Sequence, residues 1–316
     1  MKKPATFIKE YLHGRWITKH SGVGGDAFFE AHMTRCNGKA ILERDETNNV
    51  IKAAIQSGKP YMVCRFGATE LATIKTFDFE LKGKYAAQLE RVHTLSGLFP
   101  ETEETGNRFT KLMLDSIPEA DLIGIWPQAF EEYYTRIYGS ENLQYTRLRH
   151  LEPWVNPENP WTAGLKGKRV LVVHPFTESI AKQYEKRELL YPGTDILPEF
   201  DLQLLKSVQT SGGGSDERFP TWFDAYEWMK DEILRREFDV AILGCGAYGF
   251  PLAAEIKRAG KQAIHFGGGT QLLFGIMGSR WEKSERITKY INDAWSRPLE
   301  SEKPANADSV EKACYW

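Results

Sequence analysis

The stretch FDVAILGCGAYGFPLAAEIKRAGKQAIHF, residues 238–266, predicts a strand, a tight turn, a helix and a second strand in immediate succession. The turn carries the spacing Gly244-x-Gly246-x-x-Gly249 directly after the first apolar run. Glycines at such a turn let the backbone approach a ligand closely, and the following helix N-terminus offers unpaired N–H groups to an anion. We interpret this βαβ unit as a phosphate-binding turn. The alternative is that the glycines only let the helix pack against the sheet.

Further apolar runs of the same kind extend this unit into a larger sheet. They are short and almost continuously hydrophobic, which is typical of parallel strands that helices cover on both faces. The pattern therefore predicts an α/β fold, with a Rossmann-like, mostly parallel sheet and helices on both of its faces. We expect strands at 61–66, 121–126, 169–174, 238–243 and 262–266, with a weaker one at 194–197.

Two segments between these runs are predicted to be helices. Residues 221–236 place Trp222 and Tyr226 on one helical stripe, with Thr221 as the N-cap. Residues 251–259 form the helix of the glycine-turn unit, and a glycine follows them directly.

One large domain accounts for most of the 316 residues. We expect this Rossmann-like domain at 61–297, preceded by a helical N-terminal region at 1–60 that packs on it as an extension. The last residues, 298–316, are polar and carry no periodic apolar pattern, so they predict a loosely ordered tail.

The composition argues against several classes of protein. The formal net charge of −2 gives no overall basic field, so we expect no nucleic-acid partner. No segment approaches the roughly 18 consecutive apolar residues of a membrane span, so we expect no transmembrane segment and a cytoplasmic protein. The four cysteines lie far apart and form no CxxC pair, which indicates neither a disulfide framework nor a zinc site.

The sequence YMVCRFGATEL, residues 61–71, places two charged side chains around a turn at a strand end. Arg65 offers a planar, permanently charged group to a phosphate, and Gly67 marks the turn. Glu70 follows in the first turn of the next helix, where a carboxylate is suited to act as a base or to bind a divalent cation. Alternatively, Arg65 and Glu70 form a structural salt bridge, since an acid at a helix N-terminus is favourable by itself.

Two other strand ends carry candidate residues. His174 ends the run at 169–174 and is suited to donate a proton or contact a phosphate, although a structural role is the alternative. A nicotinamide dinucleotide site would place an acid where the run at 262–266 ends, and the sequence has Gly267 and Gly268 just beyond it instead. These glycines predict a second anion-accepting nest.

Two blocks of sequence together resemble the glycosyltransferases with the GT-D fold. They are CRFGATEL at 64–71 and GCGAYGFPLAAEIKRAGKQAIHFGGGTQLLFGIMGSRW at 244–281, while VVHPFTESIAKQY at 172–184 is similar to relatives found with surface-polysaccharide genes. The resemblance spans residues 61–281. In that family an Arg-Phe-Gly turn leads into an Asp-x-Glu motif that engages a divalent metal and the donor diphosphate, and the late glycine turn helps to bind the nucleotide.

The resemblance implies a glycosyltransferase that moves a sugar from a nucleotide-sugar donor to a glycan, lipid-linked or protein acceptor in surface-polysaccharide or glycoprotein assembly. Ala68 stands where the family motif has its first acid. Glu70 is therefore either a single carboxylate ligand for Mg²⁺ or Mn²⁺ or a catalytic base. The candidate catalytic residues are Glu70 and His174, and the candidate diphosphate-binding residues are Arg65, Gly67, Gly244, Gly246, Gly249, Gly267 and Gly268.

Two other functions stay open at this point. An NAD(P)-dependent oxidoreductase is favoured by the glycine turn but opposed by the missing ribose acid. A non-catalytic nucleotide-binding protein is favoured by Ala68. The sequence also leaves open the base, the sugar, the acceptor and the oligomeric state, a homo-oligomer included.

Overall fold

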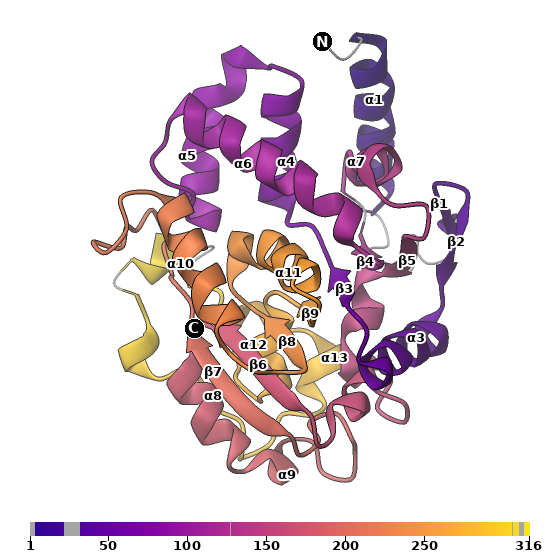
Figure 1. The fold of residues 1–316 in the computed structure, drawn as a ribbon, viewed down its shortest axis with the longest axis vertical. Helices are drawn as coiled ribbons and strands as arrows, with labels where there is room; N and C mark the ends of the chain where they lie inside the picture. The colour runs from indigo at the N-terminus through magenta and orange to yellow at the C-terminus, as the bar shows by residue number, and fades with distance from the viewer. Residues whose placement is uncertain (1–3, 22–31, 127, 305, 310–312) are drawn as a thin grey trace.

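The computed structural model describes residues 4–21, 32–126, 128–304, 306–309 and 313–316 (Figure 1). Nine strands form one sheet in the order β1-β2-β5-β4-β3-β9-β8-β6-β7. Every neighbouring pair is parallel except β1 and β2, so the predicted α/β fold with a mostly parallel sheet is confirmed. The strands are β1 (Arg35–Cys36), β2 (Lys39–Leu42), β3 (Tyr61–Cys64), β4 (Leu122–Ile125), β5 (Gln144–Arg147), β6 (Arg169–His174), β7 (Asp201–Lys206), β8 (Val240–Leu243) and β9 (Gln262–His265).

The five main strand predictions are confirmed as β3, β4, β6, β8 and β9. The weaker prediction at 194–197 is wrong, because the chain forms its strand at β7 instead. Ile196 and Leu197 are buried in the core, which explains their apolar character, but Pro198 follows them and cannot donate to a ladder. β7 pairs only with β6 and is an edge strand, so it lacks the continuous apolar run of a central strand.

Helices cover both faces of the sheet, and successive strand residues point into two separate cores. Leu171 and Val173 of β6 join the core under α4, α6, α10 and α11, whereas Val170 and Val172 join the core under α3, α8 and α12. The helices are α1 (Pro4–Ser21), α3 (Arg44–Ser57), α4 (Ala68–Asp78), α5 (Tyr85–Ser96), α6 (Glu103–Ser116), α7 (Glu131–Tyr138), α8 (Thr177–Tyr184), α9 (Arg187–Leu190), α10 (Trp222–Leu234), α11 (Gly249–Arg258), α12 (Gly269–Leu273) and α13 (Glu285–Thr288).

Both predicted helices are present. α10 begins after Thr221, whose hydroxyl accepts a hydrogen bond from the Asp224 N–H at 3.3 Å, while the Asp224 carboxylate accepts one from the Thr221 N–H at 2.9 Å. This reciprocal pair is a capping box, and it confirms Thr221 as the N-cap. α11 begins at Gly249, two residues before Pro251, so the glycine turn runs directly into the helix.

The described residues within 1–60, where we expect a helical N-terminal extension, are not all helical. They include α1 and α3, but β2 also lies within them and pairs with β5 in the main sheet. The N-terminal region therefore supplies one edge of the sheet in addition to helices (Figure 1).

Described residues within 298–316, for which the sequence predicts a loosely ordered tail, pack on the domain. Glu302 and Cys314 are buried, and the Glu302 carboxylate lies at the N-terminus of α8. Its oxygens accept hydrogen bonds from the N–H groups of Glu178 at 2.8 Å and Ser179 at 3.1 Å, and from the Ser179 hydroxyl. The described residues of this segment therefore make specific contacts with the domain.

The strand order creates a switch point between β6 and β8. The chain leaves β6 towards β7 at one edge, whereas it leaves the adjacent β8 towards β9 in the opposite direction. In open parallel sheets the crevice at the carboxyl ends of two such strands is where ligands bind. Here the glycine turn after β8 and the turn after His174 flank that crevice.

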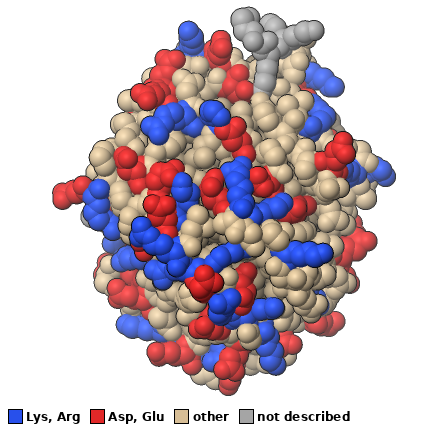
Figure 2. All heavy atoms as spheres, in the orientation of Figure 1, with Lys and Arg blue, Asp and Glu red and all other residues tan. Residues whose placement is uncertain are grey.

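The surface carries both signs of charge. Figure 2 shows Lys and Arg side chains interspersed with Asp and Glu over the face in view, in keeping with the net charge of −2. Within the described ranges, no helix has the length and apolar character needed to cross a bilayer.

The contact between Glu302 and α8 gives a stability prediction. Glu302→Ala leaves the backbone donors of α8 without their partner, so we expect the free energy of unfolding to fall by about 1–3 kcal/mol. Urea denaturation measures it. Glu300→Ala, at an exposed position two residues earlier, is the control and should change stability by less than about 0.5 kcal/mol. Equal effects of the two changes would contradict a packed tail.

Candidate functional site

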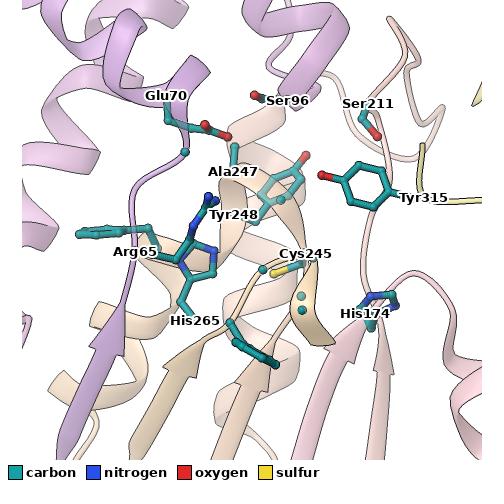
Figure 3. Close-up of a pocket in the computed structure, with 18 of the residues that line it drawn as sticks. Arg65, Glu70, Ser96, His174, Ser211, Cys245, Ala247, Tyr248, His265 and Tyr315 are labelled. Carbon is teal, nitrogen blue, oxygen red and sulfur yellow. The ribbon is translucent and has the colours of Figure 1, made fainter. Parts of the chain in front are cut away.

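A cavity of about 390 Å³ lies at the carboxyl ends of β3, β6, β8 and β9. In Figure 3 the strand arrowheads point towards it, and side chains from all four strand ends surround it. Of the predicted site residues, Gly249 does not line this cavity. The predicted residues that do line it are Arg65, Gly67, Glu70, His174, Gly244, Gly246, Gly267 and Gly268. The structure thus brings together residues that lie up to about two hundred positions apart in sequence.

Arg65 supplies positive charge to the cavity directly after β3. Its guanidinium lies 5.4 Å from the centre of the Trp126 ring, and the Trp126 indole N–H donates to the Phe66 carbonyl at 3.1 Å. Burial lowers the pKa of Arg65, and the nearby Glu70 carboxylate opposes that effect. A guanidinium remains charged under such conditions, so this side of the cavity favours an anion.

Glu70 lies over Gly67 at the start of α4. A Cβ atom added at Gly67 would come within 1.7 Å of a Glu70 carboxylate oxygen, so the glycine makes room for the carboxylate. Figure 3 shows Glu70 pointing into the cavity above Arg65. The alternative of a structural salt bridge is not seen between these two described residues, because the Glu70 carboxylate acts on Arg65 only through its charge.

The three glycines after β8 have different roles. Gly246 has φ +57°, and an added Cβ would meet nothing within 4 Å, so its backbone is open to the cavity. At Gly244 an added Cβ would lie 2.5 Å from the His174 ring, and at Gly249 it would lie 2.4 Å from the His265 ring. Gly249 therefore has a packing role instead of the predicted contact with a ligand, because it lies outside the cavity lining.

The second glycine turn, after β9, is partly covered by aromatic rings. Gly267 has φ +63°. A Cβ atom added to Gly267 would lie 3.8 Å from the Arg65 side chain. Gly268 lies under Tyr315 and Trp281, whose ring atoms are 3.1 and 3.3 Å from an added Cβ. Gly267 thus lies beside the Arg65 guanidinium, and Gly268 lies against the Tyr315 and Trp281 rings.

His174 is held as a neutral hydrogen-bond donor. Its Nδ1 atom accepts a hydrogen bond from the Phe176 N–H at 3.0 Å, which leaves the proton on Nε2. Burial lowers the pKa of His174 to about 3, so the ring carries no charge near neutral pH. An Nε2–H group donates to a ligand oxygen but cannot take a proton, which argues against His174 as the catalytic base.

His265 lies beneath Arg65 and is also neutral (Figure 3). Burial and the Arg65 charge lower its pKa to about 3, although a hydrogen bond to the Arg65 backbone opposes the shift. Its Nδ1 atom is buried without a hydrogen-bond partner in the described chain. His265 therefore adds no second positive charge to the cavity.

Several lining residues were not predicted from the sequence. The loop after β7 contributes Ser207, whose hydroxyl is buried without a hydrogen-bond partner in the described residues, and Gln209. Because that strand was misplaced at 194–197, this loop could not be recognised as a strand end. Arg280 and Tyr315 also line the cavity. Tyr315 lies in the segment for which the sequence predicts a loosely ordered tail, so it was not recognised as a site residue.

No group of three His, Cys, Asp or Glu side chains in the described residues is placed to hold a metal ion. The other carboxylate at the cavity, Glu152, accepts a hydrogen bond from the Trp154 indole at 3.1 Å and lies 3.4 Å from Arg286. Ala68 offers no oxygen ligand beside Glu70, so the turn after β3 supplies a single carboxylate.

Cys245 lies in the glycine turn and is buried. Burial raises the pKa of its thiol to about 12, so the sulfur is protonated and unreactive near neutral pH. Cys245 is therefore a small buried residue of the turn rather than a nucleophile.

No protein-family profile and no curated protein matches the chain. Two solved structures align with 83% of this chain and 92% of their own, at 14% sequence identity and a TM-score of 0.42. One is described as a selenomethionine-substituted domain of unknown function 1792, and the other as showing that this domain has a distinct glycosyltransferase fold.

The two buried histidines give a prediction about pH. We expect the imidazole NMR resonances of His174 and His265 to stay constant down to about pH 4, because both pKa values are lowered to about 3. A histidine in the unfolded state has a pKa near 6.5. Between pH 6.5 and pH 3 the unfolded state therefore binds more protons than the folded state. The free energy of unfolding should therefore decrease as pH falls from 6.5 towards 3, by up to about 1.4 kcal/mol per pH unit for each histidine. Titration midpoints near 6.5 would contradict the assignment.

Proposed function

We propose that this protein is a glycosyltransferase that uses a nucleotide-sugar donor. The observation that carries the proposal is the meeting of a cation, an open glycine turn and a carboxylate in one cavity at the switch point of a parallel sheet. A cation and open backbone N–H groups suit a diphosphate, and a carboxylate beside them suits proton removal.

The donor diphosphate would lie between Arg65 and the glycine turn after β8. Arg65 provides charge, and Gly246 provides backbone that no side chain shields. The N-terminus of α4, capped only by Gly67, adds N–H groups and the positive end of a helix dipole. These groups favour the charge that develops on the departing diphosphate, so they lower the barrier as well as bind the donor.

Glu70 would act as the base. The acceptor hydroxyl oxygen forms a bond to the anomeric carbon, and the bond from that carbon to the diphosphate oxygen breaks, its electron pair leaving with the diphosphate. The Glu70 carboxylate takes the proton of the acceptor hydroxyl. His174 donates a hydrogen bond from Nε2 to a donor or acceptor oxygen, since its Nδ1 atom is already occupied.

The acceptor and pathway follow only from the sequence resemblance. We propose a glycan, lipid-linked or protein acceptor in surface-polysaccharide or glycoprotein assembly, as that resemblance implies. Among the lining residues at the end of β9, the ribose carboxylate of an NAD site is not present, which disfavours the oxidoreductase alternative. A thermal-shift screen of nucleoside diphosphates, nucleotide-sugars and dinucleotides, with and without Mn²⁺, identifies the ligand class.

Gly246 gives a test of diphosphate binding. Gly246→Val projects a side chain into the cavity, so we expect the best nucleoside diphosphate of the screen to bind at least about tenfold more weakly, a loss of about 1.4 kcal/mol. Isothermal titration calorimetry measures it. The matched control is Gly260→Val, because Gly260 also has positive φ (+84°) and open surroundings but does not line the cavity. Both variants should lose similar stability, and equal binding by the two would argue against a phosphate at this turn.

Glu70 gives a test of catalysis. Glu70→Gln removes the base but keeps the shape of the side chain, so we expect kcat for sugar transfer to fall by about 10²–10⁴-fold while donor affinity stays near normal. Glu90→Gln, at an exposed position on α5, is the control. Transfer at the wild-type rate by the Glu70 variant would defeat the proposed base, and binding without any transfer by the wild type would favour the non-catalytic alternative.

A further inference from the structure

The C-terminal segment 314–316 is bound to the loop that follows Gly278. The Arg280 N–H donates to the Cys314 carbonyl at 2.9 Å, and the Ser279 N–H donates to the Trp316 carbonyl at 3.2 Å. An added Cβ at Gly278 would lie 2.7 Å from the Cys314 carbonyl oxygen, so only glycine lets the two backbones approach this closely. The segment is therefore part of the domain surface rather than a free end.

Side chains strengthen this attachment. The Gln271 amide donates to the Tyr315 carbonyl at 3.1 Å, and the Arg297 guanidinium donates to the Trp316 carbonyl at 3.0 Å. The Trp316 ring packs edge-on against Phe176, with ring centres 5.7 Å apart. Phe176 belongs to the turn after β6, so the segment packs at the carboxyl end of β6, beside the cavity.

This attachment places Tyr315 in the cavity wall. Its ring lies over Gly268 together with Trp281, and the two ring centres are 5.7 Å apart. Figure 3 shows the Tyr315 hydroxyl pointing towards the middle of the cavity, on the side where Arg65 lies. That hydroxyl accepts a hydrogen bond from Arg280 Nη1 at 2.9 Å.

The Tyr315 hydroxyl is bound to one of two guanidinium groups that share the cavity. Arg65 and Arg280 both line it, and the charge of Arg280 lowers the pKa of Arg65, as expected for cations close enough to repel each other. The Arg280 side chain is long and exposed, and it loses considerable rotamer freedom when it is ordered. The hydrogen bond to Tyr315 holds the Arg280 side chain on the cavity side. Less conformational entropy of that side chain is then lost when a ligand binds.

We propose that Arg280, held by Tyr315, is the second cation of the diphosphate site and that segment 314–316 completes the site as a wall. The inference rests on the proposed function, since it takes the anion to be the diphosphate of a nucleotide ligand. Two cations at one cavity match a group that carries two or more negative charges, and the binding of such a group relieves their mutual repulsion. In this role Tyr315 is a positioning residue that acts through Arg280.

The test compares single and double variants by isothermal titration calorimetry, with inorganic pyrophosphate and with uridine, guanosine and adenosine diphosphates as probes. Tyr315→Phe keeps the ring and removes only the hydroxyl, so we expect roughly three- to tenfold weaker binding with an unchanged melting temperature. Arg280→Gln should weaken binding at least as much. The double variant should bind no more weakly than Arg280→Gln alone, because the two residues act as one unit.

Tyr290→Phe is the matched control. The Tyr290 hydroxyl donates to the Trp154 carbonyl at 2.9 Å, so this variant also loses one tyrosine hydrogen bond, but Tyr290 does not line the cavity. It should bind every probe as the wild type does.

Each other outcome has a distinct meaning. If the wild type binds a diphosphate and both Tyr315→Phe and Arg280→Gln bind it equally well, the inference is overturned while the proposed function stands. Additive losses in the double variant would overturn the idea of a single unit. If the wild type binds none of the probes, the inference falls together with the proposed function.

Discussion

The parallel pairing of β8 with both β6 and β9 is the constraint on which the site depends. The ladder continues past the strand ends: the Gly244 N–H donates to the Val173 carbonyl at 2.9 Å, and the Gly267 N–H donates to the Leu243 carbonyl at 3.0 Å. Three turns are thereby held at one edge of the sheet with little freedom. Because β3 pairs with β9 on the other side, Arg65 is brought to the same edge. Ligand-binding groups from distant parts of the chain meet there because backbone hydrogen bonds align the strand ends.

Steric requirements separate the glycines of one sequence motif into different roles. Gly244 and Gly249 let the rings of His174 and His265 lie against the backbone, and both rings are consequently buried and neutral. Gly246 instead leaves its backbone open. The motif thus controls the electrostatics of the cavity in two ways, since it exposes N–H groups to an anion and keeps two histidines uncharged beside Arg65.

Much of the fold was predictable because central strands and capped helices depend on local sequence. The run at 238–243 and the cap at Thr221 each carry their own signal, and both were recognised. β7 was not, because an edge strand with one exposed face lacks a continuous apolar run. Its misplacement also hid Ser207. The sequence likewise could not reveal that 314–316 joins the site, because the hydrogen bonds that attach it are made by backbone groups, which every residue possesses.

The charge of Arg65 connects the fold to the proposed chemistry. A guanidinium that is partly removed from water is costly unless other groups compensate it. Here the Trp126 ring and the more distant Glu70 carboxylate provide that compensation without a direct ion pair. An Arg65 fully paired with Glu70 would be neutralised, and it would also occupy the carboxylate that the proposed mechanism uses as a base. The turn after β3 instead holds Glu70 over Gly67 and apart from Arg65, so neither charge is neutralised by the other. In the proposed reaction this separation leaves both groups free to act, although an ion pair would stabilise the fold more.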